Sequence, residues 1–154
     1  MSTTDIRPMR WWDIEPVMQI ETRVFDATAW TPAQFWSELA QPTREYVVAE
    51  GDEGVIGYAG LFALPPDSDI QTIAVAPSAQ GTGLGRRLAE HVMERARERG
   101  CGHMMLEVRA DNDAARRLYE RLGFEQIAVR ASYYGPGMDA VIMRCDLHDR
   151  GGAR

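Results

Sequence analysis

A short glycine-rich segment has the residue types and spacing of a loop that binds phosphate. Its residues are Gln80, Gly81, Thr82, Gly83, Leu84 and Gly85. It stands between an apolar run that ends at Val75 and a predicted amphipathic helix, whose N-terminus favours negative charge. Glycines let successive backbone N–H groups turn toward an anion, and the following Arg86 and Arg87 would add charge-assisted contacts. The spacing therefore favours a phosphate cradle over a purely structural turn.

The glycine spacing also narrows the class of phosphate ligand. A nucleoside-triphosphate loop ends in Gly-Lys-Ser or Gly-Lys-Thr, and this segment has no such ending. A dinucleotide fingerprint, Gly-x-Gly-x-x-Gly, would have its third glycine one residue after Gly85. The segment thus fits neither of these two common loops.

Glu107 is the candidate for a catalytic base. It lies between the apolar segment 104–106 and Val108, so its strand is predicted to be apolar on both faces, as a central parallel strand would be. A lone carboxylate there needs a partner or a chemical task, and desolvation is expected to raise its pKa. A buried ion pair with an arginine such as Arg109 is the alternative, and the residues alone leave both open.

Before the glycine loop, the sequence predicts an edge strand, two helices and a meander of strands. The strands are expected at 3–9, 46–49, 55–62 and 70–75, with a hairpin turn at 50–54 and a helix opening at Asp13. The second helix begins with a capping box formed by Thr31 and Gln34. Phe35, Trp36 and Leu39 are expected to form its packing face.

After the loop, helices and strands alternate. A helix whose apolar residues recur every four positions from Leu84 to Ala96 is expected to end at the left-handed cap Gly100, and a second helix is capped by Asn112 and ended by Gly123. Strands are predicted at 104–108, 125–132 and 139–146. One domain is therefore expected over 1–147, followed by a flexible tail over 148–154.

Composition sets the broad class. The chain has 154 residues, of which 45% are hydrophobic and 26% charged, as in an ordinary globular domain. No apolar run spans a bilayer and the start lacks a signal pattern, so a cytoplasmic protein is expected. The net charge of −6 argues against a nucleic-acid binder and suits a basic partner. Cys101 and Cys145 have no metal spacing, so packed, reduced thiols and no metal are expected.

The glycine loop resembles the acetyl-CoA pyrophosphate loop of the GNAT acetyltransferase superfamily, Gln/Arg-x-x-Gly-x-Gly/Ala. The stretch from Glu107 to Tyr119 is similar to the RimI type within it, the ribosomal-protein-alanine N-acetyltransferases. Glu21 with the following Trp30 fits the same type, and the resemblance covers roughly 6–147. Asp111 and Ala29 depart from the usual pattern, which bears on the range of substrates more than on the reaction.

The resemblance implies an α/β (α+β) fold with a mixed, mostly antiparallel seven-stranded sheet, split by acetyl-CoA, and helices on both faces. It implies that Glu107 acts as the base and Tyr119 as the acid that protonates the departing thiolate; without the resemblance, the helical spacing of Tyr119 with Ala115 and Leu122 is typical of a core aromatic. Acetyl-CoA would contact Ile73, Ala74, Val75, Gln80, Gly81, Thr82, Gly83, Leu84, Gly85, Arg86, Asn112 and Ala115. The acceptor would contact Trp30, Tyr133 and Tyr134.

The implied reaction is direct transfer of acetyl from acetyl-CoA to a protein N-terminal α-amine, in a ternary complex. The expected acceptor is the N-terminal alanine of a basic, small-subunit ribosomal protein, with no membrane or nucleic-acid partner. Transfer to a lysine side chain, a polyamine or another small amine keeps the same fold and stays open. A non-catalytic CoA-binding sensor is the alternative from another class.

Overall fold

The computed structural model describes residues 4–148, which divide into two compact units. The first comprises Met1–Phe62 and Thr72–Val92, and the second Ala63–Gln71 and Met93–Arg154. The strands are β1 (Asp5–Pro8), β2 (Arg44–Gly51), β3 (Gly54–Leu64), β4 (Asp67–Val75), β5 (His103–Arg109), β6 (Glu125–Arg130) and β7 (Ala140–Asp146). The helices are α1 (Ile14–Phe25), α2 (Pro32–Leu39), α3 (Leu84–Glu98) and α4 (Asp113–Arg121).

Within the described residues, the strands join in one seven-stranded sheet in the order β1-β2-β3-β4-β5-β7-β6. Its pairs are mostly antiparallel, and β4 pairs with β5 in parallel at Asp69 and Met105. The predicted mixed, mostly antiparallel sheet is confirmed. The edge strand, the β2–β3 hairpin and the order of the later elements are also as predicted.

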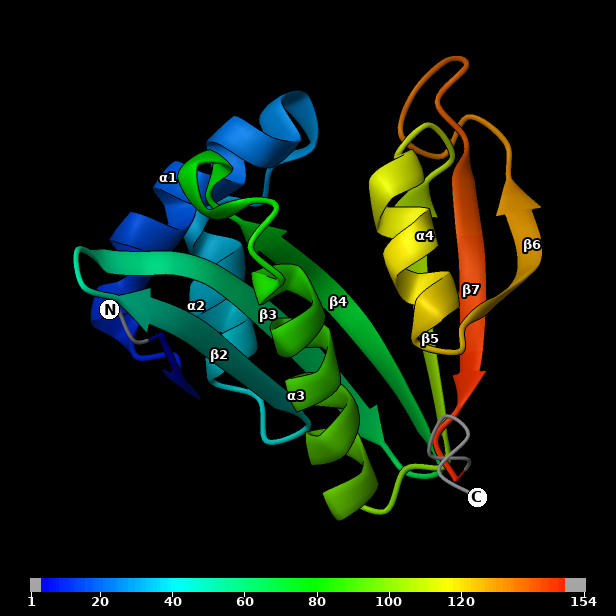
Figure 1. Cartoon of the computed structure of the whole chain (residues 1–154), viewed down its shortest axis with the longest axis horizontal. Coiled ribbons are helices and arrows are strands. Elements are labelled where there is room, and N and C mark those ends of the chain that lie inside the picture. The colour runs from blue at the N-terminus through cyan, green and yellow to red at the C-terminus, as the bar shows by residue number, and fades with distance from the viewer. Residues whose placement is uncertain (1–3, 149–154) are drawn as a thin grey trace. The chain divides into compact units, whose positions relative to one another are not determined.

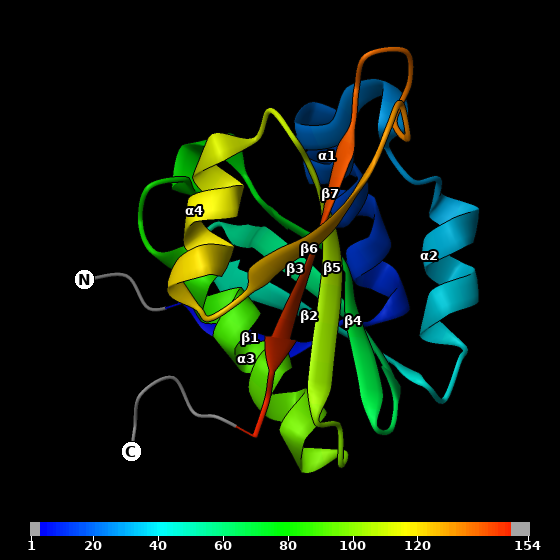
Figure 2. The same cartoon turned by 90° about the vertical axis from the view of Figure 1, so that its right-hand side faces the viewer.

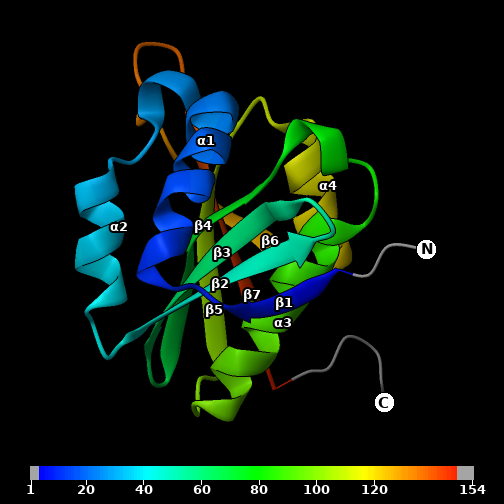
Figure 3. The same ribbon diagram turned by 90° about the vertical axis from the view of Figure 1, so that its left-hand side faces the viewer.

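In the first unit, α1 and α2 lie on one face of β2 and β3, and α3 begins on the other (Figures 1 and 3). The core on the α1–α2 face is aromatic and aliphatic, with Val17, Phe35 and Tyr58 all fully buried. On the opposite face, Gly57 lets α3 approach closely, because a Cβ there would lie 3.1 Å from the Leu88 side chain. Both faces of this part of the sheet are therefore covered.

The start of α2 follows the sequence prediction, but its packing face does not. Thr31 accepts a hydrogen bond from the Gln34 N–H at 3.2 Å, and Gln34 accepts one from the Thr31 N–H at 2.7 Å, which completes the capping box. Trp36, expected to pack in the core, is 52% exposed. Its ring stacks on that of Trp11, with centroids 6.1 Å apart. The prediction failed because Trp11, in the 3-10 turn that precedes α1, packs against this ring at the surface.

In the second unit, β5, β7 and β6 form an antiparallel ladder with α4 against one face (Figure 2). Burial alternates along β5: Met104, Leu106 and Val108 are buried, whereas Glu107 and Arg109 are partly exposed. The prediction of a strand apolar on both faces is therefore wrong. The strand is half-buried, as in an antiparallel sheet with one face covered.

The helix ends agree with the glycine signals. Gly100 and Gly123 follow α3 and α4 with φ of 90° and 99°, a conformation that glycine adopts without strain. Of the predicted tail, residues 149–154 lie outside the described residues. In the described part of the chain, no helix is long and apolar enough to cross a membrane.

Candidate active site

The glycine loop, in the first unit, connects β4 to α3 in an open conformation. Gly81 and Gly83 have φ of 79° and 86°, in the left-handed region. The loop is braced from within: the Gln80 side chain donates to the Val75 carbonyl at 3.2 Å, and the Thr82 hydroxyl to the Ala79 carbonyl at 2.6 Å. The first N–H groups of a helix have no intrahelical acceptor, so the start of α3 offers donors to an anion.

The residues around this loop fit a pyrophosphate. Gln80 to Gly83 are exposed, no acidic side chain lies between Gln80 and Gly85, and Leu84 is buried and anchors the loop. Arg86 pairs with Glu90 at 3.3 Å, and both side chains are half-exposed, so this ion pair is weak. Arg87 instead donates to the Thr4 carbonyl at 3.0 Å, which ties it to the start of β1.

Along β4, the strand that leads into the loop, buried residues alternate with partly buried ones. Ala74 is buried against the α1–α2 side of the core, whereas Ile73 and Val75 are only partly buried. The backbone N–H of Ala76 donates to the Ile56 carbonyl at 2.8 Å, which holds the end of β4 to β3. The contacts predicted for 73–75 toward acetyl-CoA stay predictions.

Trp30 is held by a buried glutamate that sequence reasoning gave no role. Its backbone N–H donates to Glu21 Oε2 at 2.8 Å, and its ring packs on Phe35 with centroids 5.1 Å apart. The Tyr58 hydroxyl donates to the other Glu21 oxygen, and Glu21 is 1% exposed. Burial raises the pKa of Glu21, and the hydrogen bonds from Tyr58 and Trp30 partly offset this. Its place four residues after Val17 on the apolar side of α1 is the signal that could have identified it.

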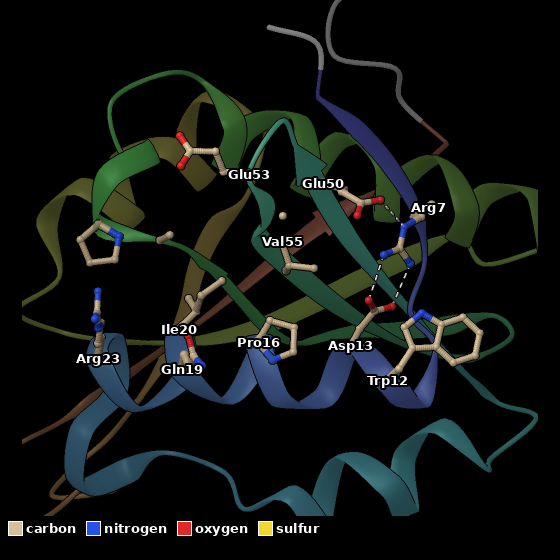
Figure 4. A pocket seen from close by; sticks show the side chains of 13 residues that line it. Arg7, Trp12, Asp13, Pro16, Gln19, Ile20, Arg23, Glu50, Glu53 and Val55 are labelled. Atoms are coloured by element: carbon tan, nitrogen blue, oxygen red, sulfur yellow. Dashed lines mark hydrogen bonds and ion pairs between the residues drawn. The ribbon is translucent and has the colours of Figure 1, made fainter.

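A pocket of about 420 Å³ lies beside α1 in the same unit, and its polar end is an ion-pair network (Figure 4). Arg7 donates to both Asp13 oxygens at 2.8 and 2.9 Å and to Glu50 at 2.9 Å. Burial alone would raise the pKa of Asp13, but the hydrogen bonds from Arg7 and the Arg10 backbone lower it. This network ties β1 to the start of α1, and none of the predicted site residues lines the pocket.

In the second unit, Glu107 lies on β5 with an arginine nearby. Its Oε1 atom is 3.4 Å from Arg130 Nη1, and the Glu107 side chain is 29% exposed. The alternative partner considered from the sequence, Arg109, instead binds Asp111 at 2.9 and 3.1 Å. Glu107 is thus neither deeply buried nor tightly paired, contrary to expectation.

Three tyrosines accompany Glu107 in this unit. Tyr119, on α4, is 4% exposed, and burial raises its pKa, with a smaller contribution from Tyr134. Burial also raises the pKa of Tyr134, and the negative charge of Glu107 adds to the rise. Tyr133 and Tyr134 are in edge-to-face contact at 5.1 Å. Tyr134 is thus influenced by Glu107 and Tyr133, and Tyr119 by Tyr134. The roles predicted for these four residues stay predictions.

The last two residues predicted to contact acetyl-CoA, Asn112 and Ala115, lie at the start of α4. The Asn112 side chain accepts a hydrogen bond from the Ala115 N–H at 3.2 Å, as a helix cap.

Cys101 and Cys145 are buried free thiols, and His103 shares a hydrogen bond of 2.9 Å with Arg144. Among residues 4–148, no group of three or more acidic, histidine or cysteine side chains has the geometry of a metal site.

A glycine loop before a helix can hold a phosphate-bearing carrier, and a carboxylate and a buried tyrosine can accept and donate the protons of acyl transfer. These features are those expected of an acyltransferase. The chain belongs to the Acetyltransferase (GNAT) family, whose profile matches residues 10–124. It is accordingly an acetyl-CoA-dependent N-acetyltransferase.

Proteins similar to this one match it over nearly its whole length. The N-alpha-acetyltransferase RimI of Mycobacterium tuberculosis (strain ATCC 25618 / H37Rv) is 41% identical over 143 residues, which cover 89% of each chain. The ribosomal protein bS18-alanine N-acetyltransferase of Salmonella typhimurium is 34% identical, over 93% of this chain and 92% of that one. The crystal structure of the ribosomal-protein-S18-alanine N-acetyltransferase from Escherichia coli has a TM-score of 0.86 at 29% identity, covering 99% of both chains.

Proposed function

We propose that this protein acetylates the N-terminal alanine of ribosomal protein bS18, by direct transfer from acetyl-CoA in a ternary complex in the cytoplasm. The observation that carries the proposal is the similarity, over 93% of this chain, to a relative named for that reaction. The net charge of −6 supports it, because a basic N-terminal segment would be attracted to an acidic enzyme.

Acetyl-CoA supplies the activated thioester, and residues of this chain handle the protons. Glu107 takes a proton from the acceptor's ammonium, directly or through water, which its partial exposure allows. The amine nitrogen then bonds to the acetyl carbon as the carbon–sulfur bond breaks. Tyr119 donates its hydroxyl proton to the departing thiolate; since its pKa is raised by burial, it holds that proton at neutral pH. The second proton, which the nitrogen loses as the amide forms, passes through water to the Tyr119 tyrosinate and restores its hydroxyl. Ile73 and Val75 would supply backbone N–H groups to the carbonyl oxygen.

A single glutamate as the base favours an α-amine as the acceptor. An N-terminal amine has a pKa of about 7.7–8.0 and lysine about 10.4, so deprotonating lysine at neutral pH costs roughly 3 kcal/mol more. Glu107 is a single carboxylate, with no second one beside it in the sequence. The amine that is already partly neutral at pH 7 needs the least deprotonation.

The test is acetylation of a peptide that begins with a free alanine and contains several lysines and arginines. Mass spectrometry is expected to find one acetyl group, on the N-terminal nitrogen. The matched control is the same peptide with its N-terminus already blocked, which should be a poor substrate. Acetyl found mainly on lysine in both peptides would contradict the proposed acceptor and leave the family assignment intact.

A further inference from the structure

Arg130, the last residue of β6, reaches Glu107 across the intervening strand β7. The register places Arg109, Ala140 and Arg130 in one row across the three strands, and Glu107, Ile142 and Ala128 in the row two residues further along. Residues in a row, and residues two apart on a strand, point to the same face. Arg130 and Glu107 therefore lie on the same face, and the Arg130 side chain reaches Glu107 diagonally across β7.

The other arginines of this face have close partners. Arg109 binds Asp111 at 2.9 Å, and Arg144 lies 2.9 Å from a ring nitrogen of His103. Charge-assisted hydrogen bonds are normally about 2.7–2.9 Å long. At 3.4 Å the pair of Arg130 and Glu107 lacks such a bond, and the Arg130 side chain is 53% exposed.

Arg130 also lies near an aromatic ring. Its guanidinium carbon lies 5.2 Å from the centre of the Tyr133 ring, a cation–π distance. Tyr133 is itself 51% exposed. The guanidinium can therefore leave the carboxylate while it stays over the aromatic ring, at little energetic cost.

An acceptor's ammonium must approach the same carboxylate to lose its proton. A guanidinium keeps its charge at any working pH and cannot give up a proton to Glu107. The two cations therefore compete for Glu107, and only the ammonium leads to reaction.

We propose that Arg130 is an internal counter-ion of Glu107 that the acceptor's α-ammonium displaces on binding. The displaced guanidinium remains over Tyr133. This inference rests on the proposed function, because it takes Glu107 as the group that receives the acceptor's proton.

The experiment compares KM and kcat for the alanine-initiated peptide in Arg130→Gln, Arg130→Lys and Arg144→Gln. Arg130→Gln is expected to lower the peptide KM about two- to five-fold, the range for release from an exposed ion pair, with kcat little changed. Arg130→Lys should restore the wild-type KM. Arg144→Gln removes the same charge from the same face and should leave KM near the wild-type value.

A double-mutant cycle isolates the pair. In Glu107→Gln, the further change Arg130→Gln should no longer alter the peptide Kd measured by calorimetry in the presence of CoA. A higher KM in Arg130→Gln, an unchanged KM, or an equal fall in Arg144→Gln would overturn the inference alone. No turnover of the peptide by the wild-type enzyme would contradict the proposed function, and this inference with it.

Discussion

Glu21 in the first unit and Glu107 in the second occupy opposite settings. Glu21 is 1% exposed and accepts hydrogen bonds from the Tyr58 hydroxyl and the Trp30 backbone. The Glu107 side chain is 29% exposed and has an arginine at 3.4 Å. The sequence predicted the deeply buried carboxylate at Glu107, and the structure has it at Glu21.

This difference separates two uses of a carboxylate. Both oxygens of Glu21 are engaged by donors of the fold itself, so the group organises the Trp30 segment and cannot change partners without breaking the core. The Glu107 side chain is partly exposed and its counter-ion lies beyond a close charge-assisted hydrogen bond, so it can exchange partners during a reaction. A buried, fully hydrogen-bonded acid is thus a structural group, and a loosely paired one is available for chemistry.

The largest expected effect concerns Glu107. Glu107→Gln should lower kcat by about 10²–10⁴, the usual contribution of one positioned acid or base, with little change in CoA affinity. The loss should be partly rescued at high pH, where the amine is already neutral; Tyr119→Phe should show a similar fall without that rescue. Steady-state kinetics between neutral and high pH measure both. A near-wild-type rate for Glu107→Gln at neutral pH would remove Glu107 from its proposed role.

The next effect is on stability. Glu21→Ala leaves the Trp30 N–H and the Tyr58 hydroxyl without their acceptor, so it should lower the free energy of unfolding by about 1–3 kcal/mol. Glu21→Gln keeps an acceptor oxygen and should be milder. Urea denaturation at neutral pH measures both, and an Ala variant as stable as the wild type would show that the contacts of Glu21 contribute little.

The difference in stability between the wild type and Glu21→Gln should also depend on pH. The pKa of Glu21 is raised in the folded state, so protonation favours folding: its contribution is complete below the unfolded value, ordinarily 4.5, and is lost as pH rises through the folded pKa. The wild type should therefore lose stability relative to Glu21→Gln as pH rises above about 4.5. A difference that stays constant from pH 4 to 8 would contradict a raised pKa.

The smallest effect is expected at the two cysteines. Both are buried, and burial raises the pKa of Cys101, which disfavours the reactive thiolate. A Cys101→Ala, Cys145→Ala variant should keep most of its activity, and initial-rate plots should intersect, as for direct transfer. Parallel plots with an acetylated cysteine found by mass spectrometry would instead show a covalent route.

Caps and turns formed by residues close together in the chain were predictable from the sequence, but side-chain partners across strands were not. The Thr31–Gln34 capping box, the Asn112 cap and the open glycine loop all depend on residues close together in the chain, and the structure has each of them. The approach of Arg130 to Glu107 depends on the register of three strands, which periodicity does not report.

The predictions for β5 and for Trp36 were wrong for the same physical reason. The β5 strand was predicted to be apolar on both faces because methionine and leucine flank Glu107, yet Met105 points with Glu107 to the partly exposed face. Trp36 was assigned to the core by its type, but stacking on Trp11 holds it at the surface. In both cases a large apolar side chain was counted as buried before its neighbours were known.

The stacked pair of Trp11 and Trp36 has a spectroscopic consequence. All four tryptophans of the chain lie between positions 11 and 36, in the first compact unit. Intrinsic tryptophan fluorescence therefore reports on α1, α2 and the strands they cover, whereas the unit that carries Glu107 has only tyrosine emission of its own. Fluorescence and circular dichroism followed together during unfolding would distinguish the loss of one unit from the loss of both.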